Sequence, residues 1–122
     1  MNEVSLQIDG GRTEYRPGEQ VVLLAGWRLD QSPTSAELRL FWHTKGKGSE
    51  DVEIVETQIL DSPKSMEERR LTFQLPNAPY SYGGRLMSII WAAELVVEPN
   101  AQSALAEFTL SADGKEVRPP EP

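Results

Sequence analysis

Apolar side chains recur at every second position over most of this 122-residue chain, and this two-residue period limits its fold more than any other feature. It is the period of a β-strand that turns one face toward a hydrophobic core. The clearest run covers residues 20–29, and further runs follow it between turns rich in Gly, Pro and Ser. The side chains that we expect in the core are Val4, Leu6, Ile8, Val21, Leu23, Ala25, Trp27, Leu29, Ala36, Leu38, Leu40, Trp42, Leu71, Phe73, Leu75, Met87, Ile89, Trp91, Ala93, Leu95, Val97, Ala106, Phe108 and Leu110.

Turn signals about every dozen residues predict an all-β fold, an immunoglobulin-like antiparallel β-sandwich of about seven strands. The length suits one domain, which we place over residues 1–112. The Pro-rich, charged residues 113–122 are predicted to form a flexible C-terminal tail. A short helix over residues 62–70 is the one helical alternative, because Ser65 and Glu68 have the spacing of a capping box.

Charge and composition limit the partners and the compartment. The net charge is −7, and no cluster of Lys and Arg offsets it, so we expect neither nucleic acid nor an anionic membrane surface as a partner. The apolar run over residues 86–97 is too short to span a bilayer, which needs about 20 residues, and we predict no membrane insertion. The chain has no cysteine and no recognisable signal peptide, so we expect a cytoplasmic protein.

The residue types that catalysis and metal binding require are scarce. His43 is the sole histidine, and no serine lies in a G-x-S-x-G turn, so we expect no catalytic residues and no enzyme. One histidine without cysteine does not make a zinc site, and the acidic residues 50–56 lack the spacing of a calcium loop. We expect no metal and no cofactor. The acidic segment is instead interpreted as a solvated edge strand, where charges oppose aggregation between sheets.

Two stretches resemble the arrestin-like family of β-sandwiches. YRPGEQV, residues 15–21, is similar to the P-G-E-x-V turn that opens a strand in that family. LP…PYSYGG, residues 75–84, followed by SIIWAAEL, residues 88–95, resembles the family's Pro-x-Ser-Tyr-x-Gly bend and the core strand after it. Leu23 and Gly83 depart from the residues that the family usually has there. The resemblance implies a single arrestin-like domain, whereas arrestins pair two, and no receptor-binding or phosphate-binding residues match.

The bend over residues 77–86 has a structural and a functional interpretation. In the first, Pro79 fixes the bend, and Tyr82 covers the edge of the sandwich with its hydroxyl bonded to backbone. In the second, Tyr80 and Tyr82, with His43, bind a carbohydrate or another small ligand.

The expected function is that of a non-enzymatic protein-interaction module. It would bind a protein partner, or a second copy of itself, through strand edges and end loops. The alternative function is a carbohydrate- or small-ligand-binding module that uses the loop aromatics.

Overall fold

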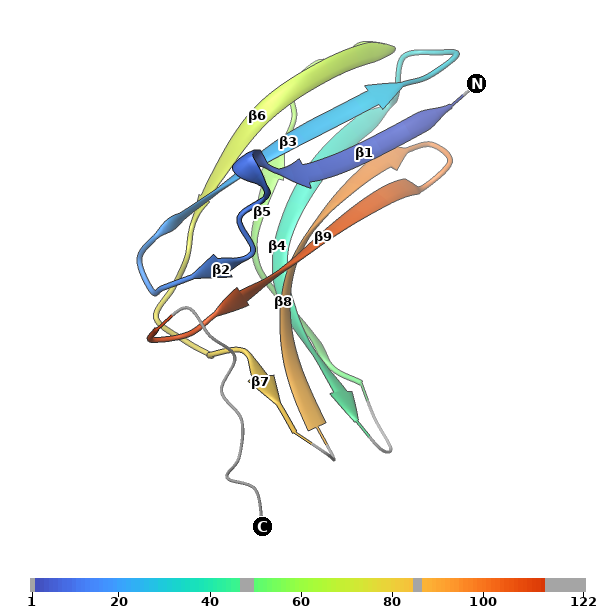
Figure 1. Ribbon diagram of the computed structural model, residues 1–122. Helices are drawn as coiled ribbons and strands as arrows, with labels where there is room; N and C mark the ends of the chain where they lie inside the picture. The colour runs from blue at the N-terminus through green and yellow to red at the C-terminus, as the bar shows by residue number, and fades with distance from the viewer. Residues whose placement is uncertain (1, 47–49, 85–86, 114–122) are drawn as a thin grey trace.

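The computed structural model describes residues 2–46, 50–84 and 87–113, which form two β-sheets packed as a sandwich (Figure 1). The smaller sheet has the strand order β1 (Glu3–Ile8), β3 (Gln20–Arg28), β6 (Met66–Gln74). The larger sheet has the order β2 (Glu14–Tyr15), β9 (Gln102–Leu110), β8 (Met87–Glu98), β4 (Ser35–Gly46), β5 (Val52–Ile59), and β7 (Tyr82–Gly83) pairs with β8. A 3-10 turn, Asp9–Gly11, follows β1.

The predicted all-β sandwich is confirmed. Seven strands run for six residues or more, and β2 and β7 add two short ones. The long strands pair antiparallel, while β2 lies parallel to β9. The helical alternative over residues 62–70 is wrong, because β6 begins at Met66 and pairs with β3 along its whole length. In this register Leu71 and Phe73 lie opposite the buried Leu23 and Val21, and burial of this face favours the strand.

The predicted inward face of most strands is the core face. Trp27 and Trp91 are buried, and Trp42 is partly buried against the core. Met87 is the clear error, since it is 46% exposed. Met87 is the first residue of β8, and the lower ends of β4 and β8 extend beyond the smaller sheet (Figure 1). In the core cluster of the described residues, Tyr15 and Leu60 are outside the predicted set, and they come from short or irregular segments without a readable period.

The turn after β2 holds Tyr15 and the start of β3 in place. The Arg16 carbonyl accepts a 3.1 Å hydrogen bond from the Glu19 amide, and Gly18 has φ +81°, as a type II turn requires. The Glu19 carboxylate accepts hydrogen bonds from the Arg12 guanidinium and the Arg16 amide, which lower its pKa. The Arg12 guanidinium also lies 4.3 Å from the Tyr15 ring centroid. Burial of Tyr15 raises its pKa.

Hydrogen bonds of Trp91 and Ser81, and not of Tyr82, hold the bend before β8. The Trp91 indole donates a 2.7 Å hydrogen bond to the Pro79 carbonyl. The buried Ser81 donates its amide to the Leu110 carbonyl at 2.7 Å, and its hydroxyl accepts the Leu110 amide at 2.9 Å. Among the described residues, the Tyr82 hydroxyl takes no part in the hydrogen bonds that hold the bend. The Tyr82 ring instead lies so close to Gly84 that an added Cβ would come within 2.7 Å of it.

The predicted domain limits are only partly visible. The C-terminal tail predicted over residues 113–122 lies outside the described residues from position 114 onward. The same holds for residues 47–49 of the tip between β4 and β5. The domain boundary at residue 112 therefore stays a prediction.

Ser81→Ala should lower the free energy of unfolding by about 1–3 kcal/mol, because it leaves the buried Leu110 amide without an acceptor. Urea unfolding followed by tryptophan fluorescence measures this change. The exposed Ser103→Ala is the control and should shift stability by less than about 0.5 kcal/mol. Equal effects of the two variants would show that Ser81 does not anchor the bend.

Candidate interaction surfaces

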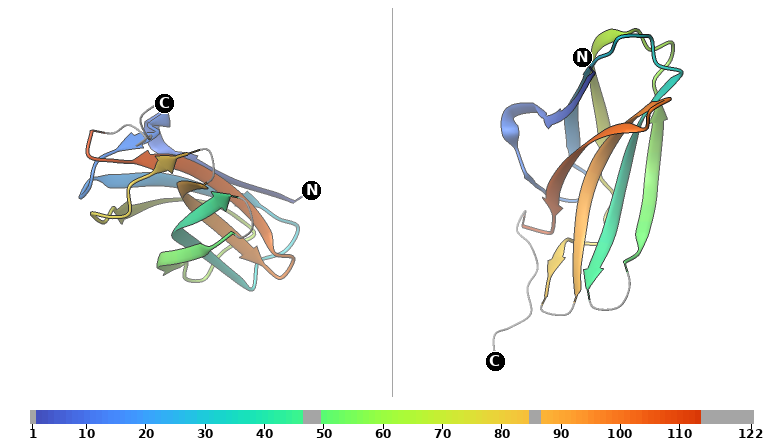
Figure 2. Two further views of the ribbon diagram at one scale, coloured as in Figure 1. Left: turned by 90° about the horizontal axis from the view of Figure 1, so that it is seen from below. Right: turned by 90° about the vertical axis from the view of Figure 1, so that its right-hand side faces the viewer.

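One side of the sandwich is closed and the other is open. On the closed side, β1 of the smaller sheet packs against β9 of the larger sheet. On the open side, β5 and β6 are edge strands, each hydrogen-bonded to a neighbour along one side only. Figure 2 shows β5 at the margin of the larger sheet, beside β4. An unpaired strand edge presents a row of free amides and carbonyls, so on this side another strand can add to β5 or to β6.

β5 carries its charged side chains on the inner face of the sheet and its aliphatic side chains on the outer face, the reverse of an ordinary sandwich strand. Glu53 and Glu56 lie opposite Trp42 and Leu40, so these glutamates are on the inner face of the sheet. Val52 and Ile54 lie opposite His43 and Phe41, on the outer face. Farther along the strand, Gln58 is on the inner face, and Thr57 and Ile59 are on the outer face. A register shift between Leu40 and Phe41 leaves Val55 as the extra residue of a β-bulge.

Exposure follows from this arrangement. The smaller sheet does not cover the inner face of β5, so Glu53 and Glu56 remain in water. The outer face has no cover either, and its aliphatic side chains are open: Ile59 is 73% exposed, Val52 62% and Ile54 51%. Val55 at the bulge is 43% exposed. A run of exposed aliphatic residues on one strand is typical of an interaction surface.

The apolar surface of β5 continues across the outer face of the larger sheet. Phe41 on β4 lies between Ile54 and Ala92 of β8. In the neighbouring row, His43 lies between Val52 and Ile90. Ala92 is fully buried by its neighbours, although it points away from the core. Farther along β4 the face becomes polar, where Arg39 forms ion pairs with Glu37 and Glu94. We call Val52, Ile54, Phe41, Ile90 and Ala92 the outer apolar patch.

The edge of β6 is partly occupied by side chains. The Gln58 amide reaches from β5 and donates a 2.9 Å hydrogen bond to the Thr72 carbonyl. Arg69 on the inner face of β6 forms an ion pair with Glu67 and donates to the Asp61 carbonyl at 2.6 Å. Hydrogen bonds from the Arg69 guanidinium and the Lys64 amide lower the pKa of Glu67. The edge of β5 is therefore the more accessible of the two.

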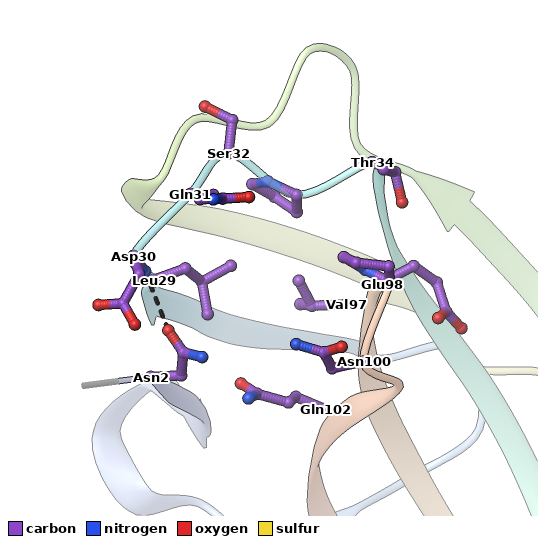
Figure 3. Close-up of a pocket in the computed structure, with 12 residues that line it drawn as sticks. Asn2, Leu29, Asp30, Gln31, Ser32, Thr34, Val97, Glu98, Asn100 and Gln102 are labelled. Atoms are coloured by element: carbon purple, nitrogen blue, oxygen red, sulfur yellow. Dashed lines mark hydrogen bonds between the residues drawn. The ribbon is translucent and has the colours of Figure 1, made fainter.

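A polar pocket of about 300 Å³ lies at one end of the sandwich (Figure 3). The segment after β3, the turn between β8 and β9, and the start of the chain form its walls. On one side of this pocket, the Asn2 side chain accepts a 2.9 Å hydrogen bond from the Asp30 amide. Four carboxamide side chains line it: Asn2, Gln31, Asn100 and Gln102.

The three residues predicted for ligand binding do not form one site. Tyr82 pairs with Ile89 and His43 pairs with Ile90, so the two side chains lie on opposite faces of the sheet. His43 is on the outer face beside Phe41, with its Nε2 3.8 Å from a Glu107 carboxylate oxygen. Tyr80, 39% exposed, lies in the same bend as Tyr82. A platform of these tyrosines cannot include His43.

Within residues 2–46, 50–84 and 87–113, no group of three or more His, Cys, Asp and Glu side chains is arranged to hold a metal ion. In the same ranges, no helix is long and apolar enough to cross a membrane.

Comparison with known proteins shows the fold. No protein-family model matches the chain, and no curated protein matches its sequence. The crystal structure of Spo0M, a sporulation control protein from Bacillus subtilis, superposes with a TM-score of 0.66 and 14% identity, covering 91% of this chain and 49% of that one. The fold is therefore arrestin-like, and the chain spans about half the length of Spo0M. A β-glucosidase from Listeria innocua in complex with gluconolactone covers 95% of this chain and 16% of its own at 15% identity, but its TM-score of 0.45 is too low to carry an argument.

Substitution on the outer face of β5 should leave stability almost unchanged. Ile59→Thr is expected to shift the free energy of unfolding by less than about 0.5 kcal/mol, because Ile59 is exposed. Leu38→Ala, on the buried face of β4, should cost about 2–5 kcal/mol and serves as the comparison. Chemical denaturation of both variants measures the difference. A loss above 2 kcal/mol for Ile59→Thr would mean that this side chain is packed in the folded chain, against our assignment of the face.

Proposed function

We propose that this chain is a non-enzymatic protein-interaction module that binds its partner by strand addition at the free edge of β5. The observation that carries the proposal is the reversed arrangement of β5, whose aliphatic residues Val52, Ile54 and Ile59 face outward and are exposed. Exposed aliphatic side chains on an unpaired edge provide both backbone hydrogen bonds and side-chain contacts for an added strand.

The ladder with β4 identifies the backbone groups that would receive the partner. The Thr44 amide donates to the Asp51 carbonyl at 2.9 Å, and the Leu60 amide donates to the Ala36 carbonyl at 2.9 Å. Because successive residues of an antiparallel strand alternate between the two edges, the backbone groups of the intervening outer-face residues point away from β4. These residues are Val52, Ile54, Thr57 and Ile59.

The comparison with Spo0M adds support for a control role. Spo0M is described as a sporulation control protein, and a control role exerted through binding is what we carry over to this chain. A cytoplasmic location, expected from the lack of cysteine, is part of the same proposal. Binding of a carbohydrate or small ligand through Tyr80 and Tyr82 stays the alternative.

Selection of extended eight-residue peptides from a random library tests strand addition. Selected peptides should protect the amides of Val52, Ile54, Thr57 and Ile59 from hydrogen exchange. Thr57→Pro should reduce their affinity at least tenfold, because it removes an amide that points to the free edge while the ladder with β4 is kept. Thr57→Ala retains that amide and is the matched control, and circular dichroism checks that both variants fold.

Protection of the β6 amides, or of the pocket at the end of the sandwich, in place of β5 would contradict the proposal. So would an affinity that is equal in Thr57→Pro and Thr57→Ala.

A further inference from the structure

From the two faces of β5 we infer the chemistry of its partner: an extended segment in which aliphatic or aromatic residues alternate with lysine or arginine. This inference rests on the proposed function, since it describes the strand that would add to β5. An added strand lies about 4.8 Å from β5, and its side chains alternate between the two faces of the extended sheet. Each face of β5 therefore selects one half of the partner's side chains.

The inner face selects for positive charge. Glu53 and Glu56 are exposed there, and among the described residues neither forms an ion pair. Residues 50–63 include Glu50, Asp51 and Asp61 as well, and contain no Lys or Arg. Arg69, the basic residue on the inner face of β6, is already paired with Glu67. A lysine or arginine of the partner, directly opposite a glutamate of β5, would supply the missing charge.

The outer face selects for apolar side chains. The five side chains of the outer apolar patch are uncharged. His43 and Glu107, 3.8 Å apart, border it on the same face, and Arg39, Glu37 and Glu94 beyond it are paired with one another. Val52 and Ile54 would gain aliphatic or aromatic neighbours on an added strand, which would remove the exposed parts of both from water. A charged residue of the partner on this face would leave the aliphatic side chains of Val52 and Ile54 in water.

A second copy of this chain fits the edge poorly. If two β5 strands paired edge to edge, the inner-face glutamates of both would lie side by side. Like charges placed opposite each other on neighbouring strands are destabilising, and each copy has a net charge of −7. The same carboxylates that exclude a second copy attract a basic segment, so charge complementarity favours a different protein as the partner.

Three synthetic peptides test the inference by isothermal titration calorimetry against the whole chain. One alternates valine with lysine, one alternates valine with glutamate, and one has the composition of the first with its lysines grouped at one end. The alternating lysine peptide should bind at least about tenfold tighter than either of the others. In the double variant Glu53→Lys with Glu56→Lys, the order of the lysine and glutamate peptides should reverse. Glu14→Lys with Glu98→Lys makes the same change in net charge away from β5 and should retain the original order.

The outcomes separate this inference from the proposed function. Equal affinities for the three peptides, or an equally tight grouped-lysine peptide, would overturn the alternating basic pattern, while protection of the β5 amides would still support strand addition. Failure of the double variant to change the order would also overturn it. Tight binding of the lysine peptide that Thr57→Pro leaves unchanged would instead contradict strand addition itself.

Discussion

The pairing of β4 with β8 is the constraint on which the rest of the structure depends. These strands are the longest in the fold, and they pair antiparallel from Ser35 opposite Glu98 to Gly46 opposite Met87. Trp42 lies opposite Trp91, and Leu38 lies opposite Leu95 on the same inward face. Once this register is set, the pleat assigns every neighbouring residue of the larger sheet to the core or to the outer face. The smaller sheet then covers the inward face.

Trp91 connects this central pair to the surrounding elements. Its ring lies 6.1 Å from the ring of Phe108 on β9, and its indole donates to the Pro79 carbonyl of the bend. Ser81 of the same bend is bonded to the end of β9. Packing and hydrogen bonding thus hold the bend in place. Exposed backbone and aliphatic side chains are found elsewhere, on β5, which flanks the central pair without joining the core.

The sequence predicts which face of a strand is buried when the two faces of that strand differ in apolar character. β3, β4 and β8 carry most of their large apolar residues, all three tryptophans included, in one phase, and this phase predicts their core faces. On β5 the aliphatic residues Ile54 and Val55 are adjacent, because the bulge shifts the phase in the middle of the strand. The period then shows two faces without showing which one is turned to the core. The exposure of Met87 could not be predicted from the sequence either, because it depends on where the smaller sheet ends.

The sequence predicted the kind of interaction site, a strand edge, but not the residues that form it. An acidic edge strand over residues 50–56 followed from the charges, and β5 is an edge strand. The separation of His43 from Tyr82 could not be seen, because it depends on the registers of β4 and β7 against consecutive residues of β8. Such registers join residues that are far apart in the chain. The polar pocket likewise gathers Asn2, Gln31 and Asn100 from three separate segments.

Amide hydrogen exchange of the free chain, measured residue by residue by NMR at low micromolar concentration, tests the central claim most directly. The account predicts that the amides of β4 and β8 exchange only through global unfolding, whereas those of Val52, Ile54, Thr57 and Ile59 exchange orders of magnitude faster. Protection of these four amides to the level of β8 would contradict the account, because it would mean that the outer edge of β5 is already covered in the free protein.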